Sequence, residues 1–334
     1  MKPTKMTKVG GVLAASVLAL TACGVSNEGG GTGGGGGDEA AGSEVDWSDC
    51  TPGEESADTA SMDADAETEI TVGAFDGWDE SFAAAHLYKH VLEQDGYTVD
   101  IQSFQAGPGY TGLAEGDIDV IMDGWLPLTH ADYLEQYGED LEAQGCWYDN
   151  AKLTIAVNED SPAQSIADLA EMGDEYGNRL VGIEAGAGLT KTTEEAAIPT
   201  YGLEDYEFVV SSTPAMLSEL QKATDEGENI AVTLWRPHWA YDAFPVRDLE
   251  DPEGAMGDAE LIYNFSRTGF GEDHPKAAQL LKNLVIDDES LSSLENVMFS
   301  EENYGGEDLD AAVEEWAGDN QEFFDSWTAG TMAD

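Results

Sequence analysis

Three tryptophans stand at or just after the ends of apolar stretches that have the composition of buried strands. Trp78 follows "ITVGAF", Trp125 ends "DVIMDGW" and Trp235 ends "NIAVTLW". Ligands of open α/β sheets bind outside the carboxyl ends of the strands. One tryptophan there usually packs, but three at equivalent places favour a binding site. Indole faces attract a cation that cannot donate hydrogen bonds, at about 0.5–2 kcal/mol per contact, so the pattern indicates a quaternary ammonium ligand.

The elements that must position these tryptophans alternate between strand and helix. Strands are expected at 68–75, 97–104, 117–125, 151–160, 180–186, 206–212 and 229–235. Apolar residues at helical spacing lie between most of them, and the chain from about 274 onward is largely helical. This alternation is typical of mostly parallel sheets with flanking helices. We predict a two-lobed α/β protein in which lobe I comprises 69–157 and 246–334 and lobe II comprises 158–245.

Residues 1–23 have the features of a targeting segment. Three lysines precede a short apolar stretch, and "LTAC" ends at Cys23. That site resembles the lipobox of bacterial lipoproteins, which implies cleavage before Cys23 and its lipidation; a plain secretory signal is the alternative. Residues 24–68 are rich in glycine and acidic residues and predict a flexible tether. We therefore expect an extracytoplasmic protein that is lipid-anchored to the outer face of the cell membrane.

Two cysteines follow Cys23, namely Cys50 in the predicted tether and Cys146 in "QGCWYDN". In an exported protein such a pair favours a disulfide. The bond would fix the second half of the tether to the folded body. Two unpaired thiols are the alternative.

The composition is strongly acidic, with 69 Asp and Glu against 13 Lys and Arg and a formal net charge of −56 at pH 7. Nucleic acids and anionic lipid surfaces are poor partners for such a charge. At about 1 M salt the Debye length falls to roughly 3 Å and the self-repulsion is mostly screened. The charge therefore indicates a solvated surface adapted to high salt.

Five segments resemble motifs of the glycine betaine-binding proteins of ABC importers: "GWDES", "DGWLPLTHADY", "GIEAGAGL", "SSTPAM" and "LWRPHW". They occur in order over most of 69–334, and related choline-binding proteins share the pattern. The resemblance implies a type II periplasmic-binding-protein clamshell that closes on a trimethylammonium group. Trp78 and Trp125 would come from lobe I and Trp235 from lobe II. It also implies an ABC permease as partner and no cofactor or metal, and we expect a monomer.

The resemblance also suggests which residues hold the other end of the ligand. His238 is similar to the family histidine that donates to the betaine carboxylate, and the start of the helix at Asp79 could face the same anion. In choline binders an acidic residue two positions after the first cage tryptophan binds the hydroxyl, and here that residue is Glu80. Choline binders add a tyrosine where this chain has Leu153, so we favour glycine betaine, with proline betaine as a related ligand and choline as the alternative. His130 is expected only to cap local structure.

Two other classes of function fit less well. An enzyme is not indicated, because the chain has no G-x-S-x-G motif and neither Cys50 nor Cys146 has the context of a nucleophile. A Ca²⁺-binding acidic surface lipoprotein would explain the acidity. It would leave the tryptophans unexplained, and the chain has no D-x-[DN]-x-[DN]-G loop.

Overall fold

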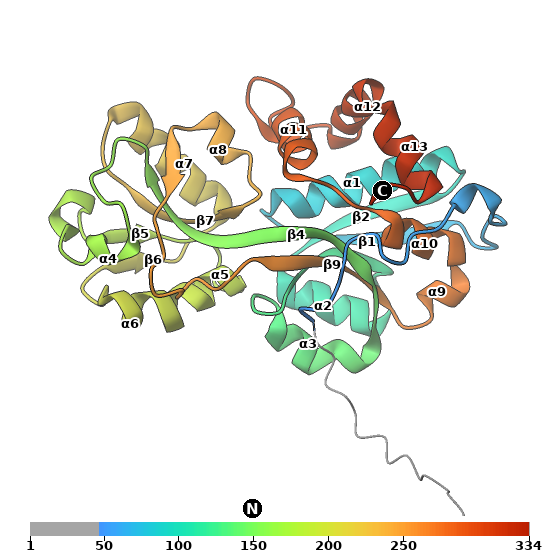
Figure 1. Ribbon diagram of the computed structural model, residues 1–334, viewed down its shortest axis with the longest axis horizontal. Coiled ribbons are helices and arrows are strands. Elements are labelled where there is room, and N and C mark those ends of the chain that lie inside the picture. Colours follow the sequence, from blue (N-terminus) through green and yellow to red (C-terminus); the bar gives the residue numbers. More distant parts are fainter. Residues whose placement is uncertain (1–46, 334) are drawn as a thin grey trace, which may run out of the picture. The chain divides into compact units, whose positions relative to one another are not determined.

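The strands of the computed structural model, which describes residues 47–333, join into one nine-stranded sheet (Figure 1). Hydrogen-bonded neighbours follow the order β2-β1-β3-β9-β4-β7-β5-β6, and β8 pairs with β4 outside this path. The strands are β1 (Glu69–Phe75), β2 (Thr98–Phe104), β3 (Val120–Leu126), β4 (Leu141–Asn158), β5 (Arg179–Val181), β6 (Glu207–Val209), β7 (Ala231–Arg236), β8 (Val246–Asp248) and β9 (Glu260–Arg267).

Two groups of strands make two lobes. In lobe I, β1 pairs in parallel with β2 and β3, and β9 pairs antiparallel with β3 and β4. In lobe II, β5 pairs in parallel with β6 and β7, and β4 pairs antiparallel with β7 and β8. The predicted two-lobed α/β fold is confirmed. The sheet is mixed rather than mostly parallel, because β4 and β9, which lie where the lobes join, run against their neighbours.

The chain passes from lobe I to lobe II within β4. Ala151 is the last β4 residue paired with β9, and Lys152 is the first paired with β7. On the return, β8 still pairs with β4, and Glu250 forms a bridge with Ser165 of lobe II. The crossings therefore lie near 151 and between 251 and 259, whereas the sequence placed them at 157 and 245. A continuous strand does not show in its sequence where its hydrogen-bonding partner changes.

Helices cover the sheet in both lobes. In Figure 1, α1 and the group α11 to α13 lie on one side of the lobe I strands, and α2 and α3 lie on the other. Lobe I contains α1 (Asp79–Gln94), α2 (Ala106–Glu115), α3 (Ala131–Tyr137), α9 (Phe270–Asp273), α10 (Pro275–Asn283), α11 (Asp288–Phe299), α12 (Leu309–Asp319) and α13 (Gln321–Ala329). Lobe II contains α4 (Ile166–Leu169), α5 (Gly188–Thr192), α6 (Ile198–Tyr201), α7 (Thr213–Glu226) and α8 (Ala240–Ala243).

The helix α1 begins directly after Trp78 and shows how the local sequence sets this part of the fold. Buried residues recur at helical spacing along it, at Ala84, Leu87, Tyr88 and Val91. Asp79 and Glu80 occupy its first turn, where the helix macrodipole favours negative charge. The side chain of Trp78 is therefore held at the junction of β1 and a helix packed on the sheet.

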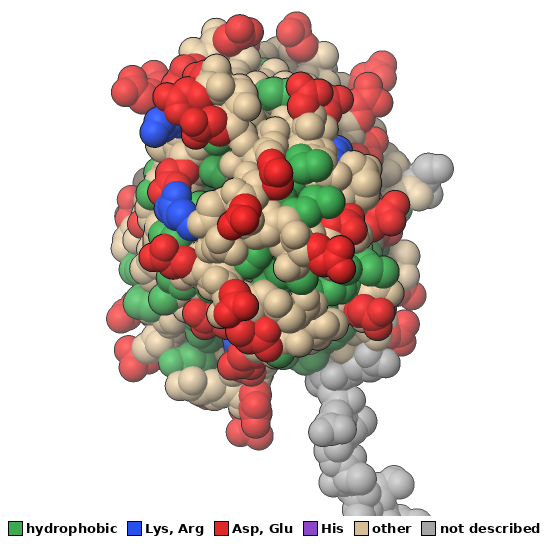
Figure 2. Space-filling model, turned by 90° about the vertical axis from the view of Figure 1, so that its left-hand side faces the viewer, with side chains coloured by type: hydrophobic (Ala, Val, Ile, Leu, Met, Phe, Trp, Pro, Cys, Tyr) green, Lys and Arg blue, Asp and Glu red, His purple; other side chains and the backbone are tan. Residues whose placement is uncertain are grey.

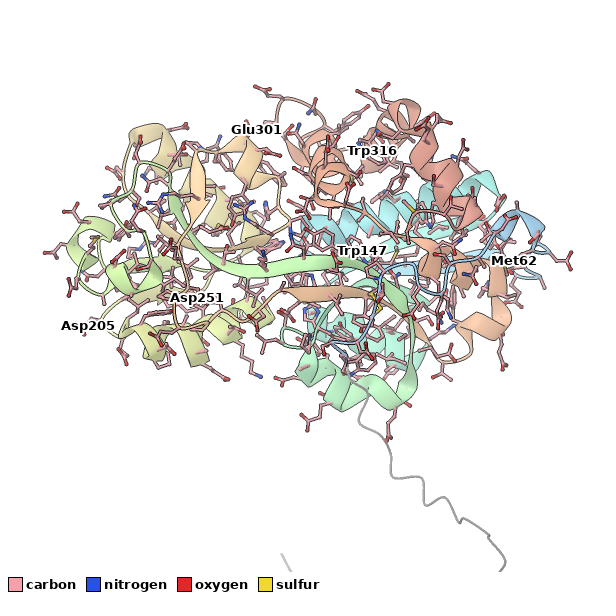
Figure 3. The ribbon with its side chains drawn as sticks, in the orientation of Figure 1. Met62, Trp147, Asp205, Asp251, Glu301 and Trp316 are labelled. Carbon is pink, nitrogen blue, oxygen red and sulfur yellow. A yellow bond between two sulfur atoms is a disulfide. The ribbon has the colours of Figure 1, made fainter. Side chains whose placement is uncertain are left out.

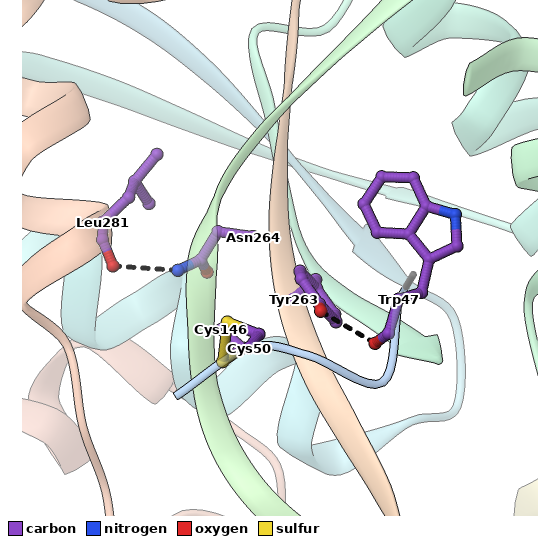
Figure 4. The surroundings of a disulfide bond; sticks show 6 residues. All are labelled: Trp47, Cys50, Cys146, Tyr263, Asn264 and Leu281. Atoms are coloured by element: carbon purple, nitrogen blue, oxygen red, sulfur yellow. Dashed lines mark hydrogen bonds between the residues drawn. A yellow bond between two sulfur atoms is a disulfide. The ribbon is translucent and has the colours of Figure 1, made fainter. Parts of the chain in front are cut away.

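Residues 47–68 pack on lobe I. A disulfide joins Cys50 to Cys146 on β4, with their Cα atoms 6.2 Å apart, and the Tyr263 hydroxyl donates to the Trp47 carbonyl oxygen at 2.8 Å (Figure 4). The buried carboxylate of Asp65 accepts two backbone N–H groups in the first turn of α10, at 3.0 and 3.1 Å. This stretch is part of the folded body, and not of the flexible tether that composition predicted for 24–68.

The predicted signal peptide 1–23, Cys23 and the first half of the tether lie outside the described residues. Within 47–333, no helix combines the length and the apolar composition that crossing a membrane requires.

Acidic side chains are spread over the surface around an apolar core. Figure 2 looks at the lobe II end, where Asp and Glu side chains dot the face and Lys and Arg are few. Asp205 and Glu301 lie at the periphery in Figure 3, whereas Trp147 lies inside. Trp147 is 1% exposed, and its indole N–H donates to the Met122 carbonyl oxygen at 2.7 Å. Most of the acidic side chains are thus on the solvated surface.

Candidate functional site

One cavity brings the three tryptophans of the sequence pattern together. It lies at the junction of the two lobes. Its lining comes from both lobes and consists of Trp78, Glu80, Trp125, Thr129, His130, Leu153, Ile183, Ala187, Gly188, Leu189 and Trp235. Each tryptophan is at least nine-tenths buried, so all three are shielded from bulk solvent.

Each tryptophan reaches the cavity from the end of a strand. Trp78 is the residue before α1, after a turn at Gly77 whose φ of +88° favours glycine. Trp125 is the last residue but one of β3. Trp235 lies near the end of β7 and pairs with Leu153 of β4. The prediction that these strand ends meet is therefore correct.

A carboxylate fixes the orientation of every indole in the cavity wall. The donor–acceptor pairs are Trp78 Nε1 to Glu184 Oε1 at 2.6 Å, Trp125 Nε1 to Asp123 Oδ1 at 2.7 Å and Trp235 Nε1 to Glu80 Oε2 at 2.9 Å. Hydrogen bonds to a charged acceptor are stronger than neutral ones. Carboxyl groups beside the rings also suit a cationic ligand, because a nearby cation stabilises their ionised form.

Glu80 belongs to the cavity wall and also to a buried acidic group. It is 2% exposed, and the neighbouring carboxyls of Asp123 and Glu295 are fully buried. Burial, followed by repulsion from those two groups, raises the pKa of Glu80 well above its ordinary value. Among the described residues, neither carboxyl oxygen of Glu295 has a hydrogen-bond partner. A cation in the adjacent cavity would offset the cost of ionising this group.

His130 lines the cavity, although the sequence pointed only to a local capping role. Its Nδ1 accepts the backbone N–H of Trp125 at 3.0 Å, so the neutral ring carries its proton on Nε2. Within the described residues, that Nε2 has no hydrogen-bond partner. Burial lowers the pKa of His130 to about 3, which keeps the ring neutral near pH 7. The site thus holds an unused N–H donor beside its tryptophans.

The loop that carries His130 is fixed from the neighbouring strand. Backbone N–H groups of Leu128 and Thr129 donate to the Glu260 carboxylate on β9, at 2.8 and 2.9 Å. The His130 N–H donates back to the Trp125 carbonyl oxygen at 2.9 Å. These bonds hold the imidazole at the end of β3.

His238 does not line the cavity, in contrast to its predicted role at the polar end of the ligand. Its Nδ1 accepts the Ala240 N–H at 3.0 Å, within its own turn. Its ring packs edge-on against Trp235, with centroids 4.5 Å apart. Burial lowers its pKa to about 3, so it is neutral. His238 therefore packs on Trp235 outside the cavity lining, whereas His130 of lobe I lines the cavity.

Asp79, also predicted at the polar end, likewise lies outside the cavity lining. Its carboxylate accepts the indole N–H of Trp239, and its Oδ2 is 3.9 Å from His238 Nε2. Burial raises the pKa of Asp79 to about 7. Asp79 therefore supports the junction of the lobes next to the cavity.

The two lobes are in contact around the cavity. The Tyr133 hydroxyl of lobe I donates to the Gly186 carbonyl oxygen of lobe II at 3.1 Å. Gly188 of lobe II lies so close to lobe I that a Cβ atom there would be 2.2 Å from the Thr129 carbonyl oxygen. This is the closed arrangement of a two-lobed protein, with the cavity enclosed at the junction.

The many acidic side chains could in principle bind a metal ion. Within residues 47–333, no group of three or more His, Cys, Asp or Glu side chains is arranged to hold a metal ion. The Ca²⁺-binding alternative has no site in that part of the chain.

Comparison with known proteins places the chain in a protein family. Residues 68–320 match the OpuAC family, the substrate binding domain of ABC-type glycine betaine transport systems. The glycine betaine/carnitine transport binding protein GbuC of Listeria monocytogenes is 37% identical over 162 residues, which are 48% of this chain and 52% of that protein. The chain thus spans about half the length of this relative in the alignment.

Two solved structures are similar over most of the chain. Lactococcal OpuAC, in its closed-liganded conformation complexed with glycine betaine, has a TM-score of 0.72 and 25% identity, over 78% of this chain and 100% of that one. An ABC-transporter choline binding protein in complex with choline has a TM-score of 0.69 and 25% identity, over 79% and 92%. Because the family match spans well over half of the sequence, the chain belongs to the OpuAC family of substrate-binding domains.

Proposed function

We propose that this protein captures glycine betaine, or a closely related trimethylammonium compound, and delivers it to the permease of an ABC importer. The observation that carries the proposal is the enclosed cavity walled by Trp78, Trp125 and Trp235. Three cation–π contacts of about 0.5–2 kcal/mol each, added to burial of the methyl groups, are enough for micromolar binding, about −8 kcal/mol. The role is binding and handover, and no catalytic step is proposed.

The polar end of the ligand is assigned to His130. Its protonated Nε2 is a donor that lacks an acceptor in the described chain, and it lies in the wall of the same cavity. A betaine carboxylate would supply that acceptor. A buried donor left without a partner costs about 1–3 kcal/mol, so the site favours a ligand that has a carboxylate over one that lacks it.

Choline is the second candidate, and Glu80 is the observation that favours it. Glu80 lines the cavity, and a carboxylate can accept the hydroxyl of choline. Leu153 lines the cavity where the resemblance to choline binders expects a tyrosine, which removes one aromatic contact. Glycine betaine is therefore preferred.

Calorimetric titration of the mature chain in about 1 M salt with glycine betaine, choline and proline tests the assignment. Micromolar binding of betaine with weaker binding of choline is expected. Tighter binding of choline would transfer the polar end to Glu80. Absence of binding by both trimethylammonium compounds would overturn the function.

We also propose that the protein is an extracytoplasmic monomer, anchored through a lipid on Cys23 and adapted to high salt. The "LTAC" segment supports the anchor, and the formal charge of −56 supports the adaptation. Replacing Cys23 by Ala should release the protein from the membrane fraction into the medium. Retention of the variant in the membrane would contradict the anchor.

A further inference from the structure

We propose that Glu184 is a positioning residue of the ligand cage that acts only when the lobes are together. This inference rests on the proposed function, because Glu184 would act on a ligand bound between the three tryptophans. Glu184 does not line the cavity, so it would act through Trp78 rather than by touching the ligand.

The bond between Trp78 and Glu184 joins the two lobes. Trp78 precedes α1 in lobe I, and Glu184 follows β5 in lobe II. The indole Nε1 donates to Glu184 Oε1 at 2.6 Å. The bond can exist only while the lobes are in contact, because its donor and acceptor belong to different lobes.

Lobe II fixes the acceptor independently of Trp78. Thr213, the first residue of α7, donates its backbone N–H to Glu184 Oε2 at 3.0 Å, and its hydroxyl lies 3.2 Å from the same oxygen. A Cβ atom on Gly77 would lie 3.3 Å from the Thr213 Cβ, so the turn before Trp78 meets α7 closely. The carboxylate is therefore already oriented when the indole arrives.

Contacts inside lobe I leave the rotation of the Trp78 ring within its own plane to this bond. The ring stacks on His130, with centroids 5.4 Å apart and an angle of 9° between planes, and meets Phe75 edge-on at 5.0 Å. Stacking permits sliding and rotation in the ring plane, whereas a hydrogen bond at Nε1 fixes that rotation. A carboxylate acceptor also increases the electron density of the indole, which strengthens its attraction for a cation.

The other two indole–carboxylate pairs differ in ways that isolate Glu184. Trp125 and Asp123 lie on the same strand, so their bond needs no closure. Glu80 bonds Trp235 across the lobes, but it also lines the cavity and faces the ligand itself. Among these acceptors, only Glu184 combines an inter-lobe bond with a position outside the cavity wall.

Opening of the lobes must break the Trp78–Glu184 bond before the ligand leaves. Loss of the acceptor should therefore speed dissociation and leave the encounter with the open form unchanged. A hydrogen bond to a charged group is worth enough to change dissociation about tenfold or more.

The test is stopped-flow tryptophan fluorescence of the full mature chain in about 1 M salt, with glycine betaine as the ligand. Glu184→Ala should dissociate the ligand about tenfold faster with an association rate within about twofold of the wild type. Glu184→Gln retains an acceptor without the charge, so its dissociation rate should lie between those of Glu184→Ala and the wild type. Glu219→Gln is the control, because Glu219 lies on α7 in the same lobe and its ion pair in the described structure is with the exposed Arg179.

Dissociation from both Glu184 variants at the wild-type rate would overturn the inference and leave the proposed function intact. A fall in the association rate equal to the rise in dissociation, together with a lower unfolding temperature, would show a structural role and would also overturn it. If Glu184→Ala does not fold, Glu184→Gln decides the matter by the same rates. Failure of the wild type to bind betaine would overturn both proposals.

Discussion

The rings of His130 and Trp78 lie parallel, with their centroids 5.4 Å apart and an angle of 9° between the planes. The stack places the His130 ring, whose Nε2 has no hydrogen-bond partner in the described part of the chain, beside a wall that would hold the cationic end of the ligand. A zwitterion with its carboxylate a methylene away from its ammonium group matches that proximity. The chemistry of the ligand can thus be tested at each end separately.

His130→Asn should weaken glycine betaine binding by about 10- to 100-fold, because the ligand carboxylate loses its donor. Choline has no carboxylate and should lose much less affinity. Calorimetric titration of both ligands measures the difference. The matched control is His238→Asn, which alters a buried neutral histidine behind Trp235 and should leave betaine affinity close to the wild-type value. The reverse ranking of the two variants would restore the original assignment of His238.

Trp235→Ala should lower betaine affinity by about 30-fold or more, corresponding to about 2 kcal/mol, while the protein stays folded. Trp235→Phe retains an aromatic face but cannot donate to Glu80, so its affinity should lie between those of Trp235→Ala and the wild type. Circular dichroism and an unfolding temperature establish the fold of each variant. Trp316→Phe on α12, at a residue that does not line the cavity, provides a comparison. Equal affinities for all four proteins would show that Trp235 only packs.

Sequence alone predicted that the three tryptophans meet, because each lies at or just after the end of a strand, and strand ends of an α/β sheet converge. The places of the three tryptophans can be predicted without knowing which side chains they contact. Their carboxylate partners were not predictable in the same way. With 69 acidic residues in the chain, no sequence pattern separates Glu184 or Asp123 from a surface carboxylate. These two carboxylates are distinguished only by their hydrogen bonds to indole groups in the folded structure.

The sequence also could not show which of two histidines, His130 or His238, lies in the cavity wall. His130 and His238 each follow a tryptophan and a proline by a few residues, in "WLPLTH" and "WRPH". In one turn the imidazole folds back onto the N–H of Trp125 and stays in the cavity wall. In the other it folds onto the N–H of Ala240 and packs behind Trp235. Turn geometry decides this, and turn geometry depends on contacts with distant strands such as β9.

Gly188→Ala should block full closure and weaken betaine binding by about tenfold or more, since its methyl group would overlap the backbone of Thr129 in the opposite lobe. Gly186→Ala is the matched control, because a Cβ atom there meets nothing within 4 Å. Small-angle X-ray scattering with saturating betaine compares the closed populations, and calorimetry compares affinities. Normal closure of Gly188→Ala would mean that the lobes accommodate a methyl group at this contact by a shift.

Asp123→Asn should change how stability depends on pH. Burial raises the pKa of Asp123 from 3.8 to about 7 in the folded protein. Between these values the folded state binds more protons than the unfolded state, so this group makes the free energy of unfolding fall as the pH rises from about 4 to about 7. His130 and His238, with pKa values lowered from 6.5 to about 3, act in the opposite direction between about pH 3 and 6.5.

The contributions of Asp123 and of the two histidines oppose each other in the wild type. The variant removes that of Asp123 and, by removing its repulsion, also lowers the pKa of Glu80, which acts in the same direction. Asp123→Asn should therefore gain stability relative to the wild type as the pH rises from 4.5 to 7.5, by at most about 4 kcal/mol from Asp123 itself. Its amide oxygen can still accept the Trp125 indole N–H, so the wall of the cavity is retained. Urea unfolding at the two pH values in about 1 M salt measures the change. Asp100→Asn, at an exposed residue of β2, controls for general loss of negative charge. If both variants show the same difference between the two pH values, surface repulsion and not burial of Asp123 sets the pH dependence.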